Sequence, residues 1–419
     1  MSTAHPADAR AVVDFDHHSP AFNADPHRAW QELREKCPVA WSENHGGFWV
    51  VSDYEGNHEV LKNTDVFTTE RSPDDPHYMA VAIPGQPNRE TILYPIELDP
   101  PNHGPVRRLL NEQLSPAQSR RMLPSIERAT TETIDEVIEA GACDLLEDIA
   151  GPVPAQVTLD WLGYPQDRIR RAAELFHWLF GYPPSSDEWK QAVASTEVEE
   201  TLQEVCAARR TEPRDDYISW LLAQEIDGRP VEEEVIVGLC FVLVGGGVDT
   251  TTSLTASALV HLDRDRELRQ RLIDDPALLV PATEEFLRVY PPLSSTARTV
   301  RQDTELRGCP VRTGDRVLVS RYGANYDEKA FPNPEEFVID RFPNKHVSFG
   351  LGPHRCVGAH LARLIFQETM RQILRRMPDY SIDESRLVHY ADRGFADGWL
   401  SLPAVYTPGP REGSPSSRS

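Results

Sequence analysis

Several features that mark other classes of protein are scarce or missing in this sequence. The 419 residues include only six cysteines, with no CxxC pair and no zinc-ligand spacing, so neither a disulfide framework nor a cysteine zinc site is indicated. The 43 basic residues are outnumbered by 66 acidic ones, and the resulting net charge of −23 argues against nucleic acid or an anionic membrane as the main partner. No internal repeat is apparent. These absences indicate an acidic globular protein in a reducing compartment.

Long hydrophobic runs are also missing. The charge-free segment 235–248 has 14 residues, whereas a membrane-spanning helix needs about 20. The N-terminus has no basic flank followed by an apolar run, so neither a signal peptide nor a membrane anchor is expected. With 40% hydrophobic and 26% charged residues, the chain can bury a large core. We therefore predict a cytoplasmic protein that binds no membrane.

The residue pattern predicts a mainly α-helical protein with a smaller β-rich part. Helical spacing dominates residues 116–280, including the segment 168–180, and it recurs at 357–377. Alternating segments at 47–54 and 303–325 read as strands, and the proline-rich stretch 71–98 reads as a long irregular connection. Because both chain ends contribute strands, we expect a single domain over 1–406, followed by a disordered tail at 407–419.

A glycine-rich loop before a cysteine is the most specific motif. Residues 346–363 read HVSFGLGPHRCVGAHLAR, a pattern F-G-x-G-x-H-x-C-x-G made by Phe349, Gly350, Gly352, His354, Cys356 and Gly358. Glycines let the backbone turn sharply and pass close to a flat ligand. At the start of a helix, free N–H groups and the dipole stabilise a thiolate. The alternative, a buried apolar cysteine after a glycine turn, leaves the other matched positions unexplained.

This loop resembles the haem-ligand loop of the cytochrome P450 superfamily. The resemblance implies that family's fold, a triangular, prism-like, mainly helical domain with a long central helix over the haem. It also implies haem b with the Cys356 thiolate as axial ligand, and haem-binding roles for Phe349, His354 and Gly358. A thiolate ligand pushes electron density onto the iron and favours O–O cleavage.

A second motif, ATEEFLRVYPP, places Glu285 and Arg288 three residues apart on one helix face. Such pairs are common on solvated helices. Here FPNPEEFVIDRF follows, and Arg341 matches the third member of the Glu–Arg–Arg cluster that the family places behind its haem loop. The resemblance gives these three residues a structural role.

A third motif, ELDPPNHGPVRRLL, resembles the family's segment that reaches the haem propionates. His103 and Arg107 are the matched positions, and Arg298 and His354 occupy the other two propionate-contacting places. Donor side chains are needed there because two carboxylates enter a low-dielectric pocket. Each of these residues alone would more often be a surface charge.

The stretch FVLVGGGVDTTTS, residues 241–253, interrupts a strongly apolar helix. Each glycine costs roughly 1 kcal/mol against alanine there. In the family this helix carries an acid–alcohol pair that delivers protons for dioxygen activation, and Asp249 and Thr250 match it. The resemblance implies that Gly246 and Gly247 let the helix approach the iron and open locally, and Gly245 suggests extra space above the haem.

Two alternative roles for these glycines are less favoured by the sequence. A phosphate-binding loop requires G-x-x-x-x-G-K-[ST], but no lysine occurs between Lys190 and Lys329. A close helix–helix contact accounts for the glycines but not for the Asp249–Thr250 pair in an otherwise uncharged stretch. Oxygen activation is the favoured interpretation.

Substrate-lining positions follow from the family's order of segments. They are mostly small or apolar, which suits a small hydrophobic substrate such as a terpenoid, a steroid-like ring system or an aromatic. Core packing is the alternative role for each of them. The positions are Leu93, Val242, Gly246, Leu293, Thr296, Ala297, Phe395 and Ala396.

Electrons must come from another protein, because no flavin- or nicotinamide-binding fingerprint occurs. The resemblance implies an iron–sulfur ferredoxin served by a flavin reductase. A basic docking patch on the cysteine side of the haem is expected at Arg108, Arg120, Arg121 and Arg355, each of which could equally be a solvated arginine.

The predicted function is that of a monooxygenase that uses dioxygen to hydroxylate or epoxidise its substrate. Alternatives are a haem-thiolate enzyme of atypical chemistry, such as phenol coupling, nitration or peroxide-driven oxidation, and a non-catalytic haem-thiolate sensor. The Asp249–Thr250 pair disfavours the peroxide-driven and sensor alternatives, which have no need of proton delivery.

Overall fold

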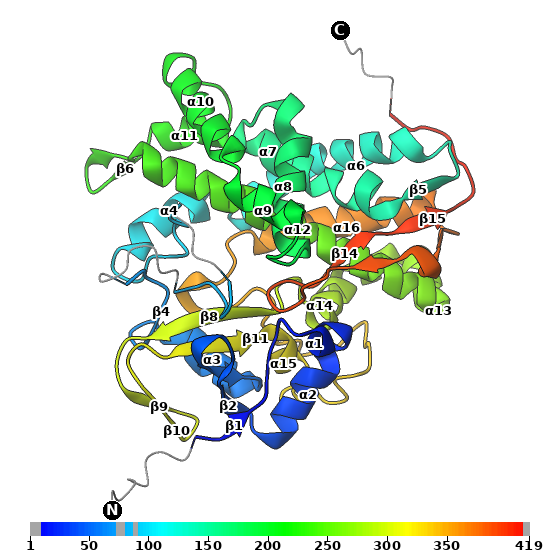
Figure 1. Ribbon diagram of the computed structural model, residues 1–419. Coiled ribbons are helices and arrows are strands. Elements are labelled where there is room, and N and C mark those ends of the chain that lie inside the picture. Colours follow the sequence, from blue (N-terminus) through cyan, green and yellow to red (C-terminus); the bar gives the residue numbers. More distant parts are fainter. Residues whose placement is uncertain (1–9, 73–79, 87–90, 414–419) are drawn as a thin grey trace, which may run out of the picture.

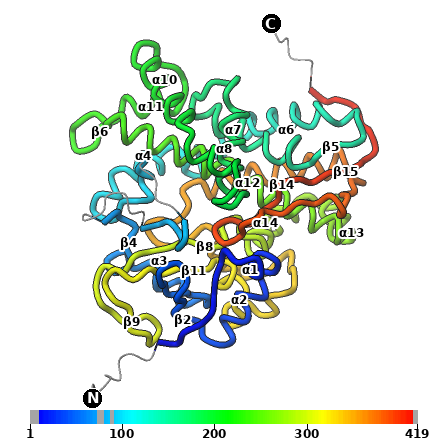
Figure 2. Tube along the Cα trace, in the orientation of Figure 1, coloured from blue at the N-terminus to red at the C-terminus, as the bar shows by residue number. Residues whose placement is uncertain are grey.

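The computed structural model describes residues 10–72, 80–86 and 91–413, and it combines a large helical region with a smaller β-rich region (Figure 1). Segments from both halves of the sequence lie side by side in the β-rich region (Figure 2). The mainly α architecture and the interleaving of the chain ends agree with the sequence prediction.

The main sheet has six strands in the order β1-β2-β3-β11-β8-β4. Strands β3 and β11 are parallel although some 260 residues separate them, with Trp49 opposite Val317. The central strands β3 and β11 are largely apolar and buried, as expected for strands inside a sheet. Their bounds are β1 (Val12–Val13), β2 (Val39–Ser42), β3 (Phe48–Val51), β4 (Phe67–Thr68), β8 (Ser295–Val300) and β11 (Arg316–Ser320).

Short helices cover this sheet, and shorter sheets lie elsewhere. The helices are α1 (Pro20–Ala24), α2 (Pro26–Lys36), α3 (Tyr54–Lys62) and α15 (Arg321–Asn325). The small sheets pair β5 (Ala142–Asp144) and β12 (Ser381–Ile382) with β15 (Pro403–Val405), β13 (Val388–His389) with β14 (Trp399–Ser401), β9 (Thr304–Leu306) with β10 (Cys309–Val311), and β6 (Glu225–Ile226) with β7 (Arg229–Pro230).

The helical region is built around α12 (Glu233–Arg264), which packs on α7, α8, α10 and α16. The other helices are α4 (His103–Gln113), α5 (Pro116–Arg121), α6 (Leu123–Val137), α7 (Pro152–Leu162), α8 (Ile169–Gly181), α9 (Asp187–Ala194), α10 (Glu197–Thr211), α11 (Tyr217–Leu222), α13 (Arg266–Asp274), α14 (Leu279–Val289) and α16 (Ala359–Arg376). Short helical turns are η2 (Asn44–Gly46), η3 (Leu146–Ala150), η4 (Gln166–Arg168), η5 (Pro276–Leu278), η6 (Gly352–His354) and η7 (Glu384–Arg386).

Helix α12 is apolar on nearly all sides because other helices surround it. Among the described residues it is the one helix whose length and composition would allow it to cross a membrane, and 72% of its most apolar window is buried inside the protein. A helix that is hydrophobic all round is typical of the core of a large protein. Helix α12 is therefore a buried core helix.

The predicted disorder is wrong for residues 407–413. Residues 407–413 are held against α6 and α16: the Gly409 N–H donates to the Ile138 carbonyl at 3.0 Å, and Arg375 pairs with Glu412 at 2.5 Å. The Asp135 carboxylate accepts hydrogen bonds from the N–H groups of Glu412 and Gly413. The composition of this segment is typical of a tail, but these specific contacts hold it in place. Residues 414–419 lie outside the described residues.

Candidate active site around Cys356

The cysteine loop makes a tight turn immediately before α16. The Cys356 N–H donates to the Phe349 carbonyl at 2.7 Å. Gly350 and Gly352 both adopt a φ of +67°, which L side chains rarely take. A Cβ on Gly352 would also lie 2.7 Å from the Leu61 carbonyl oxygen. The two glycines are therefore needed for the turn and for the close approach of the loop to α3.

The electrostatic surroundings of Cys356 combine burial with positive charge. Burial raises the pKa of the thiol, whereas the Gly358 N–H and the guanidinium groups of Arg107, Arg355 and Arg321 oppose that rise. The side chain is accessible although it lies deep in the protein. Metal coordination deprotonates a thiol outright, so these N–H and cationic groups suit a metal-bound thiolate.

Buried nitrogen donors without a partner lie near this loop. Among the described residues, Nε of Arg298, Nε and Nη1 of Arg321, and Nε2 of His103 have no hydrogen-bond partner. Burial lowers the pKa of both arginines to about 10, because no carboxylate compensates either charge fully. Unpaired buried cations are costly, and the two propionates of a haem would supply the missing negative charges. The donor set therefore fits this cofactor.

The structure places the two predicted histidines next to each other. The rings of His103 and His354 are 4.7 Å apart. Burial, together with the charges of His354 and Arg107, lowers the pKa of His103 to about 4. His354 Nε2 lies 3.1 Å from the Asp99 carboxylate, which also accepts hydrogen bonds from the hydroxyl groups of Thr68 and Thr69. His354 is thus already paired with a carboxylate, while Nε2 of His103 is unpaired.

The remaining predicted haem-binding residues lie around the same loop. Arg107 on α4 donates to the carbonyl of Arg355. The Arg363 guanidinium lies 4.5 Å from the ring centre of Phe349. Gly358 is the N-cap of α16, and a Cβ there would lie 3.9 Å from the Cys356 sulfur.

The Glu285 cluster connects α14 to the segment that leads into the cysteine loop. Glu285 and Arg288 are fully buried and pair at 2.8 Å, and Arg341 joins the same carboxylate at 3.0 Å. Asn344 also donates to Glu285, at 3.0 Å. The hydroxyl of Ser348 donates to the Leu287 carbonyl at 2.5 Å. The three residues that the motif singled out are therefore in contact, and they are bonded to the residues just before the loop.

The three glycines of α12 face three different surroundings. A Cβ on Gly245 would lie 2.5 Å from the Phe176 ring on α8, and one on Gly247 would lie 2.8 Å from Thr158 on α7. A Cβ on Gly246 would meet nothing within 4 Å. The expectation that Gly245 enlarges the space above the haem is therefore wrong, because this glycine accommodates Phe176. Gly247 likewise admits a neighbouring helix, and Gly246 alone faces open space.

Helix α12 does not open locally at the glycines, contrary to the prediction. It is α-helical from 233 to 264. The hydroxyl of Thr250 donates to the Gly246 carbonyl at 2.7 Å. The Gly246 carbonyl thus accepts the hydroxyl of the predicted catalytic threonine, one turn along the helix.

Asp249 is tied to two residues from other parts of the chain. Its Oδ1 lies 2.7 Å from His177 Nδ1 on α8, and its Oδ2 accepts a hydrogen bond of 2.7 Å from the Tyr390 hydroxyl. Burial lowers the pKa of His177, but the hydrogen bond and charge of Asp249, helped by Glu147, raise it above its usual value. Glu147 lies at the protein surface. Glu147, His177 and Asp249 are therefore neighbouring titratable groups, and His177 and Asp249 are in contact.

The predicted substrate-lining residues are only partly brought together. Val242 and Gly246 lie one turn apart on α12, Leu293 pairs with Ala396 in an isolated bridge, and the Phe395 ring stacks on Phe180 at 5.5 Å. Leu93 packs against the core that contains α12, and Thr296 is half-buried on β8. Ala297 lies apart from them.

Ala297 packs into the sheet core with Ala40, Val50 and Leu318, and it is 0% exposed. Side chains alternate along a strand, so Ala297 lies on the opposite face of β8 from Thr296 and Arg298. Its predicted place in a substrate pocket is therefore not supported.

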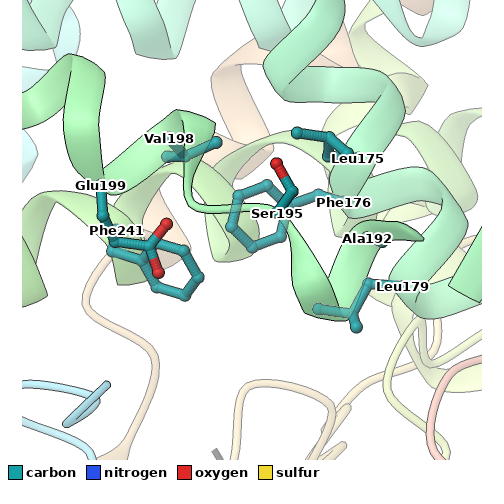
Figure 3. Close-up of a pocket in the computed structure, with 8 residues that line it drawn as sticks. All are labelled: Leu175, Phe176, Leu179, Ala192, Ser195, Val198, Glu199 and Phe241. Carbon is teal, nitrogen blue, oxygen red and sulfur yellow. The ribbon is translucent and has the colours of Figure 1, made fainter. Parts of the chain in front are cut away.

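A small, mainly apolar hollow lies between α8, α9, α10 and α12 (Figure 3). Its walls include Phe176, which fills the notch at Gly245, and Phe241. The Glu199 carboxylate also borders it. None of the predicted substrate-lining residues borders this hollow.

The predicted basic residues lie at the surface. Arg108, Arg120, Arg121 and Arg355 are all exposed. The charges of Arg355 and Arg120 contribute to lowering the pKa of His360 on α16, after burial and Arg363. Some of these arginines are therefore close enough to form a positive surface beside the cysteine loop.

Four residues of the site were not found from the sequence. Arg321 directly follows an apolar strand, and Asp99 lies beside two prolines in the segment that was matched. His177 and Tyr390 carry no motif, because they reach Asp249 only through the tertiary fold. Of these four residues, only Arg321 gave a signal in the sequence, because it directly follows an apolar strand.

These features define a class of protein: a mainly helical enzyme that binds haem through a cysteine loop, with a long helix carrying an acid–alcohol pair. A sequence model described as Cytochrome P450 matches residues 277–378. A steroid C26-monooxygenase of Mycolicibacterium smegmatis is 31% identical over 386 residues, which cover 91% of this chain and 92% of that protein. Cytochrome P450-terp of a Pseudomonas species is 28% identical, with coverage of 90% and 93%.

Solved structures agree with this assignment. A Bacillus megaterium cytochrome P450 in complex with corticosterone has a TM-score of 0.80 at 29% identity, and the match covers 92% of this chain and 100% of that one. A Mycobacterium marinum cytochrome P450 in complex with pseudoionone has a TM-score of 0.84 at 26% identity, covering 97% and 100%. The chain belongs to the cytochrome P450 family and is a monooxygenase. Its cofactor is haem with a cysteine thiolate as axial ligand, and Cys356 is the cysteine of the matching loop.

Proposed function

We propose that this cytochrome P450 hydroxylates or epoxidises a small hydrophobic molecule of the steroid, terpenoid or aromatic class, in the cytoplasm, with electrons from a ferredoxin and its reductase. Relatives named for steroid oxidation and neighbours solved with corticosterone and pseudoionone support this class. The apolar character of Val242, Leu293 and Phe395 also suits it.

The surroundings of Gly246 are the observation that carries the proposal. Gly245 and Gly247 are closed off by Phe176 and Thr158, whereas a side chain on Gly246 would enter open space. This surface lies one helical turn before Thr250, whose hydroxyl donates to the Gly246 carbonyl. A substrate held against Gly246 would therefore lie beside the predicted proton-delivery residues.

Haem, when bound, would be the group at which dioxygen is activated: with electrons from the ferredoxin and protons delivered by the chain, one oxygen atom enters the substrate and the other leaves as water. The residues of the chain hold the cofactor, exclude water and move protons. We assign the propionates to His103, Arg107, Arg298 and Arg321, with His354 supported by Asp99. In this assignment Arg298 and Arg321, which have unpartnered nitrogens among the described residues, would contact the two propionates.

Proton movement can be assigned to specific atoms. We assign His177 as the group that passes protons from Glu147 to Oδ1 of Asp249, while the Tyr390 hydroxyl holds Oδ2. We assign Thr250 as the last donor, because its Oγ1 is on the open side of α12. Its lone pairs can accept a proton from Asp249, and its own hydroxyl hydrogen must leave the Gly246 carbonyl before it can be passed on. The Asp249 carboxylate is hydrogen-bonded to both His177 and Tyr390, so it must release one of these bonds before it can turn toward Thr250.

A ligand titration tests the substrate class. Purified haem-loaded protein is titrated with a panel of steroids, terpenoids and aromatics, and the low-spin to high-spin change is recorded. We expect Gly246→Val to weaken binding of the best ligand by at least tenfold, about 1.4 kcal/mol, while haem content stays normal, because the new side chain would occupy the space proposed for the substrate. The matched control is Gly104→Val, since Gly104 is also helical and also faces open space. Unchanged affinity in Gly246→Val would contradict the proposal.

A further inference from the structure

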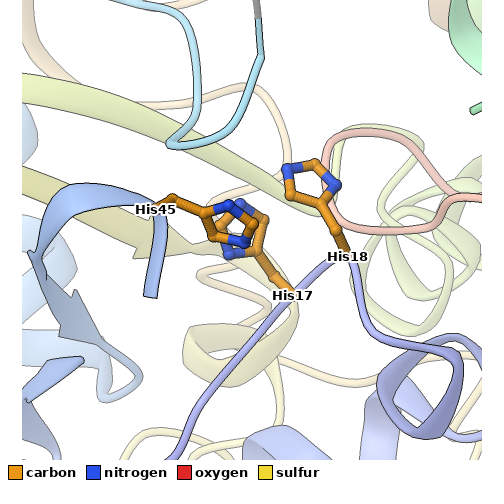
Figure 4. A group of neighbouring side chains, drawn as sticks. All are labelled: His17, His18 and His45. Carbon is orange, nitrogen blue, oxygen red and sulfur yellow. The ribbon is translucent and has the colours of Figure 1, made fainter. Parts of the chain in front are cut away.

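Three histidines far from the cysteine loop come together where separate segments of the chain meet (Figure 4). His17 and His18 precede α1, and His45 lies in η2, between β2 and β3. One ring nitrogen of each lies within 4.8 Å of those of the other two. The ring centres of His17 and His18 are 4.1 Å apart, and His45 lies 5.4 and 5.2 Å from them.

The same turn of the chain borders all three rings. The Pro84 carbonyl oxygen lies 2.9 Å from Nε2 of His17 and 2.9 Å from Nε2 of His18. A Cβ on Gly85 would lie 2.9 Å from Nδ1 of His45 and 3.1 Å from Nε2 of His18. Three nitrogens and one carbonyl oxygen therefore converge on this turn.

Two carboxylates determine where the protons lie on the rings. Nδ1 of His18 is 2.7 Å from Asp392 Oδ2, and Nε2 of His45 is 2.8 Å from Asp16 Oδ1. A carboxylate only accepts, so these two nitrogens carry hydrogen, and in a neutral ring the other nitrogen carries a lone pair. Nε2 of His18 then faces the Pro84 oxygen, and two acceptors in contact need a proton or a cation between them.

His17 can offer a lone pair as well. It is fully buried, and its Nδ1 has no hydrogen-bond partner among the described residues. Its Nε2 lies against the Pro84 oxygen and its Nδ1 is unpartnered within the described part of the chain, so a neutral ring keeps one nitrogen with a lone pair for a metal. A histidine that ligates a metal through one nitrogen while the other donates to a carboxylate is the usual outer-shell arrangement, and His18 and His45 both have it.

We propose that His17, His18 and His45, with the Pro84 carbonyl oxygen, form a binding site for a divalent transition-metal ion such as Zn²⁺. Three imidazoles and one oxygen match the ligand number and type that zinc prefers. Asp16 and Asp392 add negative charge next to the ligands.

Such an ion would join separate parts of the chain. It would connect the segment before α1, the β2–β3 turn and the 84–85 turn. Through Asp392 it would also reach the turn that carries Phe395 and Ala396, two of the predicted substrate-lining residues. His45 adopts a φ of +53°, a left-handed conformation that costs free energy in a non-glycine residue, and this conformation places its ring in the cluster.

Zinc binding to untagged, haem-loaded protein tests the proposal. After treatment with EDTA, the protein is titrated with ZnCl₂ by calorimetry, and we expect one ion per chain. X-ray absorption at the zinc edge should show only nitrogen and oxygen neighbours at about 2.0–2.1 Å, which distinguishes this site from binding by cysteine. Zinc should also raise the thermal midpoint, because it binds the folded state.

Variants locate the site. His45→Asn removes the ring but tolerates the left-handed backbone, and it should abolish the stoichiometric binding. Asp16→Asn should weaken it about 10- to 100-fold. His58→Ala on α3 is the control and should bind like wild type. No stoichiometric zinc in the wild type would show that a proton on His18 occupies the gap, and binding unchanged in His45→Asn would place zinc elsewhere. Either result overturns the proposal.

Discussion

Replacement of Glu285 by alanine should destabilise the protein far more than replacement of its neighbour Glu284. Glu285 is 0% exposed and accepts hydrogen bonds from Arg288 at 2.8 and 2.9 Å, Arg341 at 3.0 Å, the Val338 N–H at 2.9 Å and Asn344 at 3.0 Å. Breaking a buried ion pair by removing one partner costs about 3–5 kcal/mol, because the other charge is left uncompensated.

The structure places the expected cost at the lower end of that range. The Arg288 guanidinium keeps hydrogen bonds to the carbonyls of Asn325, Pro334 and Glu336 when the carboxylate is removed. We therefore expect about 3 kcal/mol for Glu285→Ala. Because the cluster bonds to residues 344–348, the variant should also bind little haem.

Glu284 is the matched control because it lies next in sequence on the same helix. It pairs with Arg363 at 2.6 Å and with His346 at 3.2 Å, but its side chain is 32% exposed. Partly solvated pairs contribute only about 1 kcal/mol. Urea unfolding followed by circular dichroism, together with the carbon monoxide difference band of the reduced protein, measures both effects. Equal urea midpoints for the two variants, or a normal haem content in Glu285→Ala, would refute the reasoning.

The contribution of Glu284 to the free energy of unfolding should decrease as the pH falls. Burial raises its pKa, but Arg363 and His346 lower it further, to about 2 from an ordinary value of 4.5. A lowered folded-state pKa gives stability that is present above 4.5 and lost as the pH falls toward 2. The difference in urea midpoint between wild type and Glu284→Gln should therefore shrink below about pH 4.5. A difference in urea midpoint that grows as the pH falls would contradict this prediction.

Three further predictions concern catalysis, stability and electron transfer. Thr250→Ala should keep consuming reducing equivalents but release peroxide, with product formation down about tenfold or more, whereas Thr251→Ala should remain coupled; coupled turnover in Thr250→Ala would contradict the assignment. Tyr390→Phe removes a hydrogen bond to a buried carboxylate and should cost about 1.5–3 kcal/mol in urea unfolding; an unchanged midpoint would show that this bond contributes nothing. Arg108→Glu should slow ferredoxin-dependent reduction in stopped-flow experiments and alter its salt dependence, and identical kinetics would exclude Arg108 from docking.

Local patterns allowed much of the fold and part of the site to be predicted. The cysteine loop, the helix after it and the Glu285–Arg288 pair depend on residues close together in sequence, where spacing decides which side chains share a face. Contacts between distant segments could not be predicted in this way. Asp249 meets His177 across 72 residues and Tyr390 across 141. The histidine cluster likewise requires the β2–β3 turn to fold back onto the segment before α1.

The three glycines of α12 show why spacing alone was insufficient. Successive residues of a helix point about 100° apart, so adjacent glycines must face different neighbours. Here the first faces Phe176, the second open space and the third Thr158. The glycine run therefore has two roles that belong to different residues. Gly245 and Gly247 allow close packing, and Gly246 leaves open space. The glycines that seem to weaken the core helix therefore allow two close helix contacts that fix its position, and between these contacts lies the open surface on which we propose that the substrate binds.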